Sequence, residues 1–272
     1  MRVKSCGLAT DLMLAGFDGE VVHGTGYVAV RTPSNPAFWW GNFVLFAAPP
    51  PDGQIARWEA IFDREVGCVA GIEHRNFSWD AVRGELGNAA AFVARGYTLD
   101  RAIFLAARSV RRSPHHCEDV VVRPIRSDAE WAGALEVQHQ SLAPGQDTAS
   151  FRAFQSTQMR RSRAMVESGF LSWFGSFIEG RLVATMGLCV QQGVGRCQAV
   201  ATLPAFRRQG TASTLVHDVC AYGFERMGAA EIWIMTGEDN AAARVYRSVG
   251  FEDSERVSSL SISTRTGPTH GA

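Results

Sequence analysis

The sequence predicts an α+β protein of two domains, each with a mixed, mostly antiparallel sheet flanked by helices. Three observations support this prediction. The chain has 272 residues, which is comfortable for two domains of ordinary size. Short β-prone runs separated by glycine turns fill residues 171–202, a pattern typical of an antiparallel meander. From Gly210 onward apolar residues recur at i, i+3, i+4, i+7 and i+8, which predicts a helix that ends near Gly228.

The other predicted elements follow from the same two periodicities. In the second half we expect helices over 131–140, 151–167 and 241–249, and strands over 171–178, 181–190, 196–202, 231–236 and 257–262. In the first half we expect helices over 8–15 and 55–65, and strands over 26–31, 38–46 and 102–107. If 38–46 is one strand, Phe38 and Trp40 face one side of the sheet and Trp39 the other.

A polar segment interrupted by Pro114, residues 111–119, has the composition of an interdomain linker. A β-prone run begins afresh at Val120. We therefore place the boundary near Glu118, which gives domains 1–118 and 119–272.

Composition excludes several classes of protein. Lys+Arg and Asp+Glu both number 27, so no overall field attracts nucleic acid or an anionic membrane. No stretch approaches the ~20 apolar residues of a membrane span, and residues 1–8 contain no sustained apolar run of signal-peptide length. The six cysteines form no C-x-x-C pair, which favours a reducing, cytoplasmic location. The single lysine, Lys4, excludes Walker-type and Schiff-base lysines elsewhere.

Two motifs indicate the chemistry. Residues 202–212 read Thr-Leu-Pro-Ala-Phe-Arg-Arg-Gln-Gly-Thr-Ala and join a strand to a helix, where backbone N–H groups can surround phosphate oxygens. About thirty residues later, a short helix from Asn240 carries Tyr246 and stops at Gly250. In this order and at this separation, they resemble the two signature motifs of the GNAT superfamily of acetyl-CoA-dependent N-acyltransferases.

The resemblance implies a role for each matching position. A GNAT protein would use acetyl-CoA as cosubstrate and transfer the acetyl group by direct attack of a primary amine. Tyr246 would be the general acid that protonates the departing thiolate. Asn240 would contact the coenzyme or cap its helix. The coenzyme would otherwise be held by the pantetheine-pairing Val200, Ala201 and Thr202 and by the diphosphate-binding Arg207, Arg208, Gln209, Gly210, Thr211 and Ala212.

The general base is not evident from the sequence. Many GNAT relatives carry a glutamate on the strand before the turn, where this chain has Gln198 followed by Ala-Val-Ala. Glu238 and Asp239 are the nearest carboxylates, although a role in capping a helix explains them better. A non-catalytic module that binds coenzyme A therefore remains an alternative, as does an assembly scaffold with an occluded turn.

The first half contains a weaker copy of the second motif. The run from Asn88 to Gly96 echoes that from Asn240 to Gly250, at an offset of 240 − 88 = 152 positions. No tyrosine takes the place of Tyr246, and the stretch matching the diphosphate turn contains three prolines, 49–51, which lack amide donors. We interpret residues 1–118 as a degenerate GNAT-like copy.

Other combinations of reactive residues carry less weight. Residues 115–119, His-His-Cys-Glu-Asp, include metal-ligand types, but adjacent ligands in a linker rarely converge, so we expect no metal site. His217 and Asp218 are helix neighbours about 100° apart, and no G-x-S-x-G motif accompanies them. We expect a small-molecule or peptide amine as acceptor, and no nucleic-acid or membrane partner. The acceptor's identity, the acyl-chain length and the oligomeric state stay open.

Overall fold

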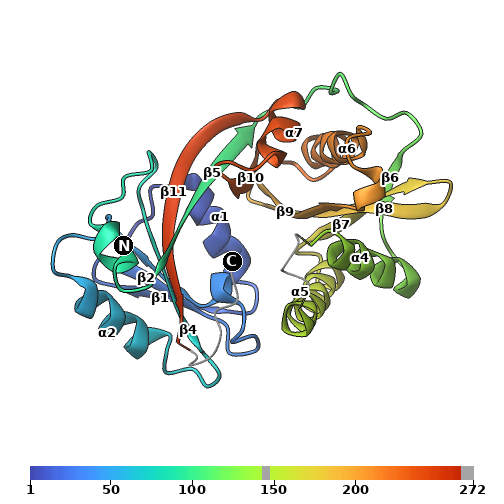
Figure 1. Cartoon of the computed structure of the whole chain (residues 1–272). Coiled ribbons are helices and arrows are strands. Elements are labelled where there is room, and N and C mark those ends of the chain that lie inside the picture. The colour runs from blue at the N-terminus through green and yellow to red at the C-terminus, as the bar shows by residue number, and fades with distance from the viewer. Residues whose placement is uncertain (143–147, 265–272) are drawn as a thin grey trace. The chain divides into compact units, whose positions relative to one another are not determined.

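The computed structural model describes residues 1–142 and 148–264, and its mixed sheets flanked by helices confirm the α+β class (Figure 1). Contacts divide the chain into two compact units. The described part of the first unit comprises Met1–Phe104, Met235–Glu238 and the chain from Ser254 onward. The second comprises Leu105–Ile234 and Asp239–Asp253.

The first unit is a mixed sheet with strand order β1-β2-β3-β4-β11-β5. β3 and β4 run parallel, and the other registered pairs are antiparallel. Two strands of this order, β5 and β11, are each divided between the units, as is the strand Glu231–Gly237. The elements are α1 (Cys6–Ala15), β1 (Glu20–Gly24), β2 (Tyr27–Arg31), the 3₁₀ turn η1 (Trp39–Gly41), β3 (Phe43–Phe46), α2 (Ile55–Glu65), β4 (His74–Trp79), α3 (Ala89–Val93), β5 (Thr98–Ala107) and β11 (Glu252–Ser263).

Aromatic side chains form the core of the first unit. α2 places Trp58, Ile61 and Phe62 on one face at i, i+3 and i+4, and all three are buried. Trp58 stacks on Phe46 with ring centroids 3.8 Å apart, and Phe77 packs against both rings edge-on. This packing fixes α2 on the face of β3 and β4.

The predicted strand over 38–46 is wrong in its first half. Trp39–Gly41 form a 3₁₀ turn, so the predicted alternation of Phe38, Trp39 and Trp40 does not occur. The side chain of Asn42 explains the turn, because its Nδ2 donates to the carbonyls of Asn35 and Phe38 while its Oδ1 accepts from the Thr32 amide. Local side-chain hydrogen bonds thus outcompete the sheet ladder here.

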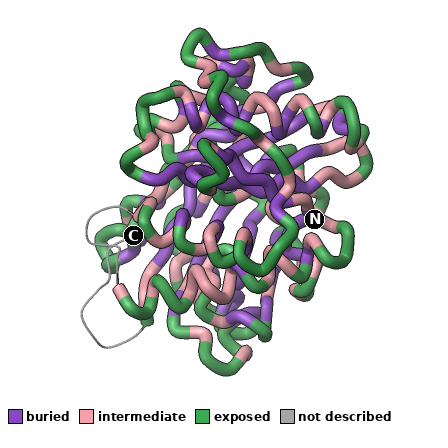
Figure 2. The backbone as a smooth tube through the Cα atoms, turned by 90° about the vertical axis from the view of Figure 1, so that its right-hand side faces the viewer, coloured by how far each residue is buried: buried purple, intermediate pink, exposed green. Residues whose placement is uncertain are grey.

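The second unit has strand order β10-β9-β8-β7-β6, with only the β9–β10 pair parallel. Helices α4 and α5 cover one face and α6 the other (Figure 1). Figure 2 colours the described backbone by burial. Strands β7 to β10 are largely buried, whereas β6 is exposed or half-buried. The elements are β6 (Val121–Pro124), α4 (Asp128–Gln140), α5 (Ala149–Glu167), β7 (Ser172–Ile178), β8 (Arg181–Gln191), β9 (Val194–Thr202), η2 (Pro204–Phe206), α6 (Thr211–Arg226), β10 (Glu231–Gly237) and α7 (Ala242–Ser248).

The division by contacts differs from the predicted boundary at Glu118. The first break lies between Phe104 and Leu105, and the final strand returns to the first unit. There β11 pairs antiparallel with β4, with Ser259 opposite Ser78. Leu260 is buried in the aromatic core, which explains why this strand joins the first sheet.

Among the described residues, no helix combines the length and the apolar character needed to cross a membrane.

Candidate coenzyme-binding site

The site begins where β9 and β10 separate. The two strands pair over only three positions, and the last pair is Arg196 with Trp233. Ala199 then adopts a positive φ of 47°, and the register with β8 shifts at this point, which indicates a β-bulge. Gln138 of α4 donates to the Ala199 carbonyl at 2.7 Å and so fixes the bulged strand. Beyond Arg196, no described strand pairs with this side of β9.

The turn into α6 presents free amides. Gly210 is the N-cap with a φ of +81°, and Arg208 also has a positive φ of 59°. The first helical hydrogen bond runs from the Thr214 amide to the Gly210 carbonyl. Within the described chain, the backbone N–H groups of residues 208–213 have no acceptor. Together with the helix dipole, they form a site suited to an anion.

The predicted linker packs against this turn. We call Ser113–Cys117 the strap. A Cβ added to Gly210 would lie 1.8 Å from the carbonyl oxygen of His115, and the Cys117 amide donates to Oγ1 of Thr214 at 2.8 Å. The absent side chain of Gly210 therefore makes room for the strap.

A cavity of about 810 Å³ opens beside the turn. Of the residues predicted to bind coenzyme or act in catalysis, its walls include Val200, Ala201, Thr202, Arg207, Arg208, Gly210, Ala212, Asn240 and Tyr246. The sequence analysis missed Ser113 and His115 of the strap, Ser141 after α4 and Arg244 on α7. Three arginines and a histidine, but no carboxylate of the described chain, line this cavity. Its charge suits an anionic ligand.

Some predicted residues have other contacts. Gln209 and Thr211 do not line the cavity: the Gln209 side chain donates to the Ala205 carbonyl, and Thr211 is buried. Arg207 donates from Nε to the Thr202 carbonyl and from Nη2 to the Ser141 carbonyl, so it ties β9 to the end of α4. Within the described residues, the Arg208 side chain donates no hydrogen bond to the protein. Arg208 is therefore more available than Arg207 to pair with a bound phosphate.

Tyr246 lies on α7 and is buried except for the part that lines the cavity. Asn240 accepts a hydrogen bond from the Ala242 amide at 2.9 Å, which fits its predicted capping role. Burial raises the pKa of Tyr246 above its ordinary value of 10.0, and the nearby thiols of Cys197 and Cys220 raise it further. The phenol therefore stays protonated.

The two carboxylates considered as bases do not line the cavity. Glu238 pairs with Arg101 at 3.0 Å and with Arg256 at 3.3 Å, and Asp239 is exposed. The structure therefore shows neither a helix-capping hydrogen bond nor a position for a general base at Glu238 or Asp239. Any base among the described lining residues has to be something other than a carboxylate.

The amide turn, the open edge of β9 and the buried phenol together fit a coenzyme-dependent acyl transfer. Residues 139–251 match the model of the acetyltransferase (GNAT) family. This GNAT segment contains every residue predicted for the site. The match covers less than half of the chain and supports placing this segment with the GNAT acetyltransferases, a family that uses acetyl-CoA.

Solved structures share the fold over most of the chain. A conserved protein of unknown function from Staphylococcus epidermidis ATCC 12228 has 12% identity and a TM-score of 0.73, with 90% of this chain and 94% of that chain covered. A GCN5-related N-acetyltransferase from Kribbella flavida has 18% identity, a TM-score of 0.66 and coverages of 95% and 96%. A tandem GNAT protein from the clavulanic acid biosynthesis pathway has 16% identity, a TM-score of 0.50 and coverages of 81% and 72%. None of the curated proteins compared matches the sequence.

Proposed function

We propose that the second unit binds acetyl-CoA and transfers its acetyl group to a primary amine by direct attack. The observation that carries the proposal is the run of unpaired amides over residues 208–213 at the N-terminus of a 16-residue helix, beside a cavity lined by arginines. A diphosphate satisfies such amides better than water does, because its oxygens are charged acceptors.

The proposed chemistry uses groups that line the cavity. The pantetheine arm would lie along the open edge of β9 at Val200–Thr202, as an added strand does. The amine nitrogen attacks the thioester carbonyl, the new C–N bond forms and the C–S bond breaks. Tyr246 protonates the departing thiolate, and water takes the proton that the amine loses. The products are an N-acetyl amine and coenzyme A.

A second candidate function is a non-catalytic module that binds coenzyme A. The lack of any carboxylate among the described lining residues favours it, because direct attack requires a neutral amine. The two functions separate in a thiol-release assay over a panel of primary amines. Coenzyme binding with no turnover of any amine supports the module.

Ala212 offers a clean test of the diphosphate site. It lines the cavity in the first turn of α6, where an acidic side chain favours the helix but repels a bound phosphate. We expect Ala212→Glu to weaken coenzyme A binding by about tenfold or more in isothermal calorimetry. Ala212→Gln, of the same size and no charge, is the control and should weaken it less. Unchanged affinity in Ala212→Glu, or no heat with the unmodified protein, contradicts the proposal.

We also infer that residues 88–97 are a degenerate copy of the second motif. Both helices end alike: Phe251 donates to the Tyr246 carbonyl at 3.1 Å, and Tyr97 donates to the Phe92 carbonyl at 3.2 Å. This alignment puts Phe92, fully buried, at the position of Tyr246. The Asn88 amide already donates to the Pro50 carbonyl at 2.7 Å. The first copy thus has no hydroxyl at the position of Tyr246, and its Asn88 amide already has an acceptor within the protein. Both features support a single coenzyme site, in the second unit.

A further inference from the structure

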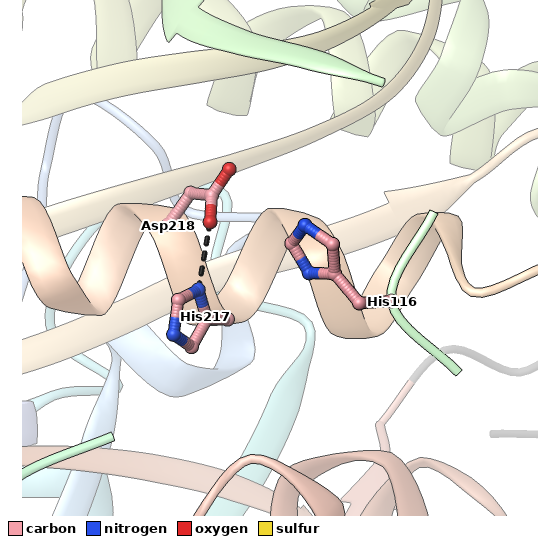
Figure 3. A group of neighbouring side chains, drawn as sticks. All are labelled: His116, His217 and Asp218. Atoms are coloured by element: carbon pink, nitrogen blue, oxygen red, sulfur yellow. Dashed lines mark hydrogen bonds and ion pairs between the residues drawn. The ribbon is translucent and has the colours of Figure 1, made fainter. Parts of the chain in front are cut away.

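Three potential metal ligands lie close together beside the turn that leads into α6. His116 comes from the strap, and His217 and Asp218 come from α6 (Figure 3). Each offers one ligand atom, and these atoms all lie within 4.8 Å of one another. All three residues are half-buried, so an ion can enter while most of its surroundings are already formed. The strap and the helix belong to the same compact unit.

The histidine and aspartate of α6 are already turned toward each other. Nδ1 of His217 and Oδ1 of Asp218 are 2.7 Å apart, although helix neighbours leave the axis about 100° apart. A cation can replace the proton of this hydrogen bond. With metal–ligand bonds of about 2.0–2.2 Å, the N···O separation only has to widen to roughly 3 Å.

The third ligand is oriented by its own neighbours. The His116 ring stands edge-on to the His217 ring, with centroids 5.8 Å apart and planes at 85°. Its Nδ1 lies 3.4 Å from Oγ1 of Thr214, the same oxygen that accepts the Cys117 amide. A partner on one ring nitrogen fixes the ring and leaves the other nitrogen available for a metal.

We propose that His116, His217 and Asp218 bind a divalent transition-metal ion such as Zn²⁺, which fastens the strap to α6. Two imidazoles and one carboxylate with a fourth position for water are an established zinc donor set, and imidazole also suits copper and nickel. The bound ion joins a wall of the coenzyme cavity to the helix that presents the free amides. The site requires only these three side chains, so a test of metal binding does not depend on whether the protein transfers acetyl groups.

The first experiment measures the ion directly. Full-length protein stripped with a chelator is titrated with ZnSO₄ in a calorimeter, and Co²⁺ binding is followed by its visible absorption. We expect one ion per chain. His116→Ala, His217→Ala and Asp218→Asn should each weaken binding by about tenfold or more. His115→Ala is the matched control, because it removes the neighbouring imidazole of the same strap, and it should bind Zn²⁺ like the unmodified protein.

The second experiment tests the fastening. Zn²⁺ should slow amide hydrogen exchange over residues 113–117 in the unmodified protein and leave it unchanged in His116→Ala, with circular dichroism showing that the variant is folded. The proposal is overturned if no ion binds, if His116→Ala binds as tightly as the unmodified protein, if His115→Ala loses binding equally, or if exchange in the strap ignores Zn²⁺.

Discussion

At the scale of single residues, two helix ends of similar geometry differ in one side chain. Tyr246 and Phe92 both precede a terminating glycine by four positions, and both helices close with the same pattern of hydrogen bonds. Phe92 lies wholly in the first core, whereas Tyr246 keeps an edge on the cavity. Tyr246 also carries a hydroxyl group, which Phe92 lacks.

Replacing Tyr246 by phenylalanine tests the proposed proton donor. We expect kcat in the thiol-release assay to fall by about 10²–10⁴-fold, because the thiolate then leaves without a positioned acid. Coenzyme affinity should change little, since the ring still packs against the same neighbours. Tyr222→Phe, which removes a more exposed hydroxyl from α6, is the control. An active Tyr246→Phe enzyme would exclude the phenol as the acid.

At the scale of elements, α4 positions the bulged strand. Its C-terminal end supplies Gln138 to the Ala199 carbonyl and Ser141 to the Thr202 carbonyl. Its N-terminus is held by a capping box in which Glu130 accepts from the amides of Arg126 and Ser127 and pairs with Arg123 of β6. The helix therefore joins a well-capped start to the edge of the coenzyme cavity.

This cap should make stability depend on pH. Hydrogen bonds from the Ser127 and Arg126 amides, with a smaller contribution from Arg123, lower the pKa of Glu130 from 4.5 to about 2. A lowered folded-state pKa means that the stabilisation is complete above the unfolded value and is lost as the pH falls through the folded value. Glu130→Gln should reduce the free energy of unfolding near neutral pH by about 0.3–1 kcal/mol.

Thermal melts near pH 7 and near pH 2 measure this effect. The difference between Glu130→Gln and the unmodified protein should shrink at the acid end, where Glu130 is about half protonated in the folded state and almost fully protonated in the unfolded state. Glu225→Gln, which changes a carboxyl on α6, serves as the control and should show no such convergence. A difference that stays constant with pH rules out the charged cap as its cause.

At the scale of the molecule, the two units are not successive stretches of chain. The chain leaves the first unit after Phe104 and returns for the last strand. The returning segment also supplies Glu255, a buried carboxylate that accepts from the Ser5 hydroxyl and from the amides of Cys6 and Gly7 at the start of α1. The first unit therefore needs both ends of the sequence.

Cutting the chain at the predicted boundary tests this arrangement. We expect fragment 1–118 to melt without a cooperative transition, because it lacks the β11 residues that pair with β4 and bury Leu260 in the core. Adding a peptide of residues 252–264 should restore a transition in circular dichroism, whereas a scrambled peptide should not. A cooperative melt of fragment 1–118 alone, at the temperature of the full chain, would contradict the assignment.

Local signals in the sequence determined most helices and strands and the position of the turn that leads into α6. Helical period, glycine turns and motif spacing depend on residues close together in the chain, so one sequence reveals them. Asn42 shows the limit of this approach, because its side-chain hydrogen bonds convert part of a β-prone aromatic run into a turn.

Only the tertiary structure decided how the strap, the last strand and the histidines are placed. The Cys117 amide donates a hydrogen bond to Thr214, 97 positions away in the chain, and the rings of His116 and His217 pack edge-on. Leu260 packs into a core built from the first hundred residues. These contacts depend on which faces remain unpaired once the sheets have formed. No local periodicity encodes that outcome, because packing selects it from many arrangements compatible with the same elements.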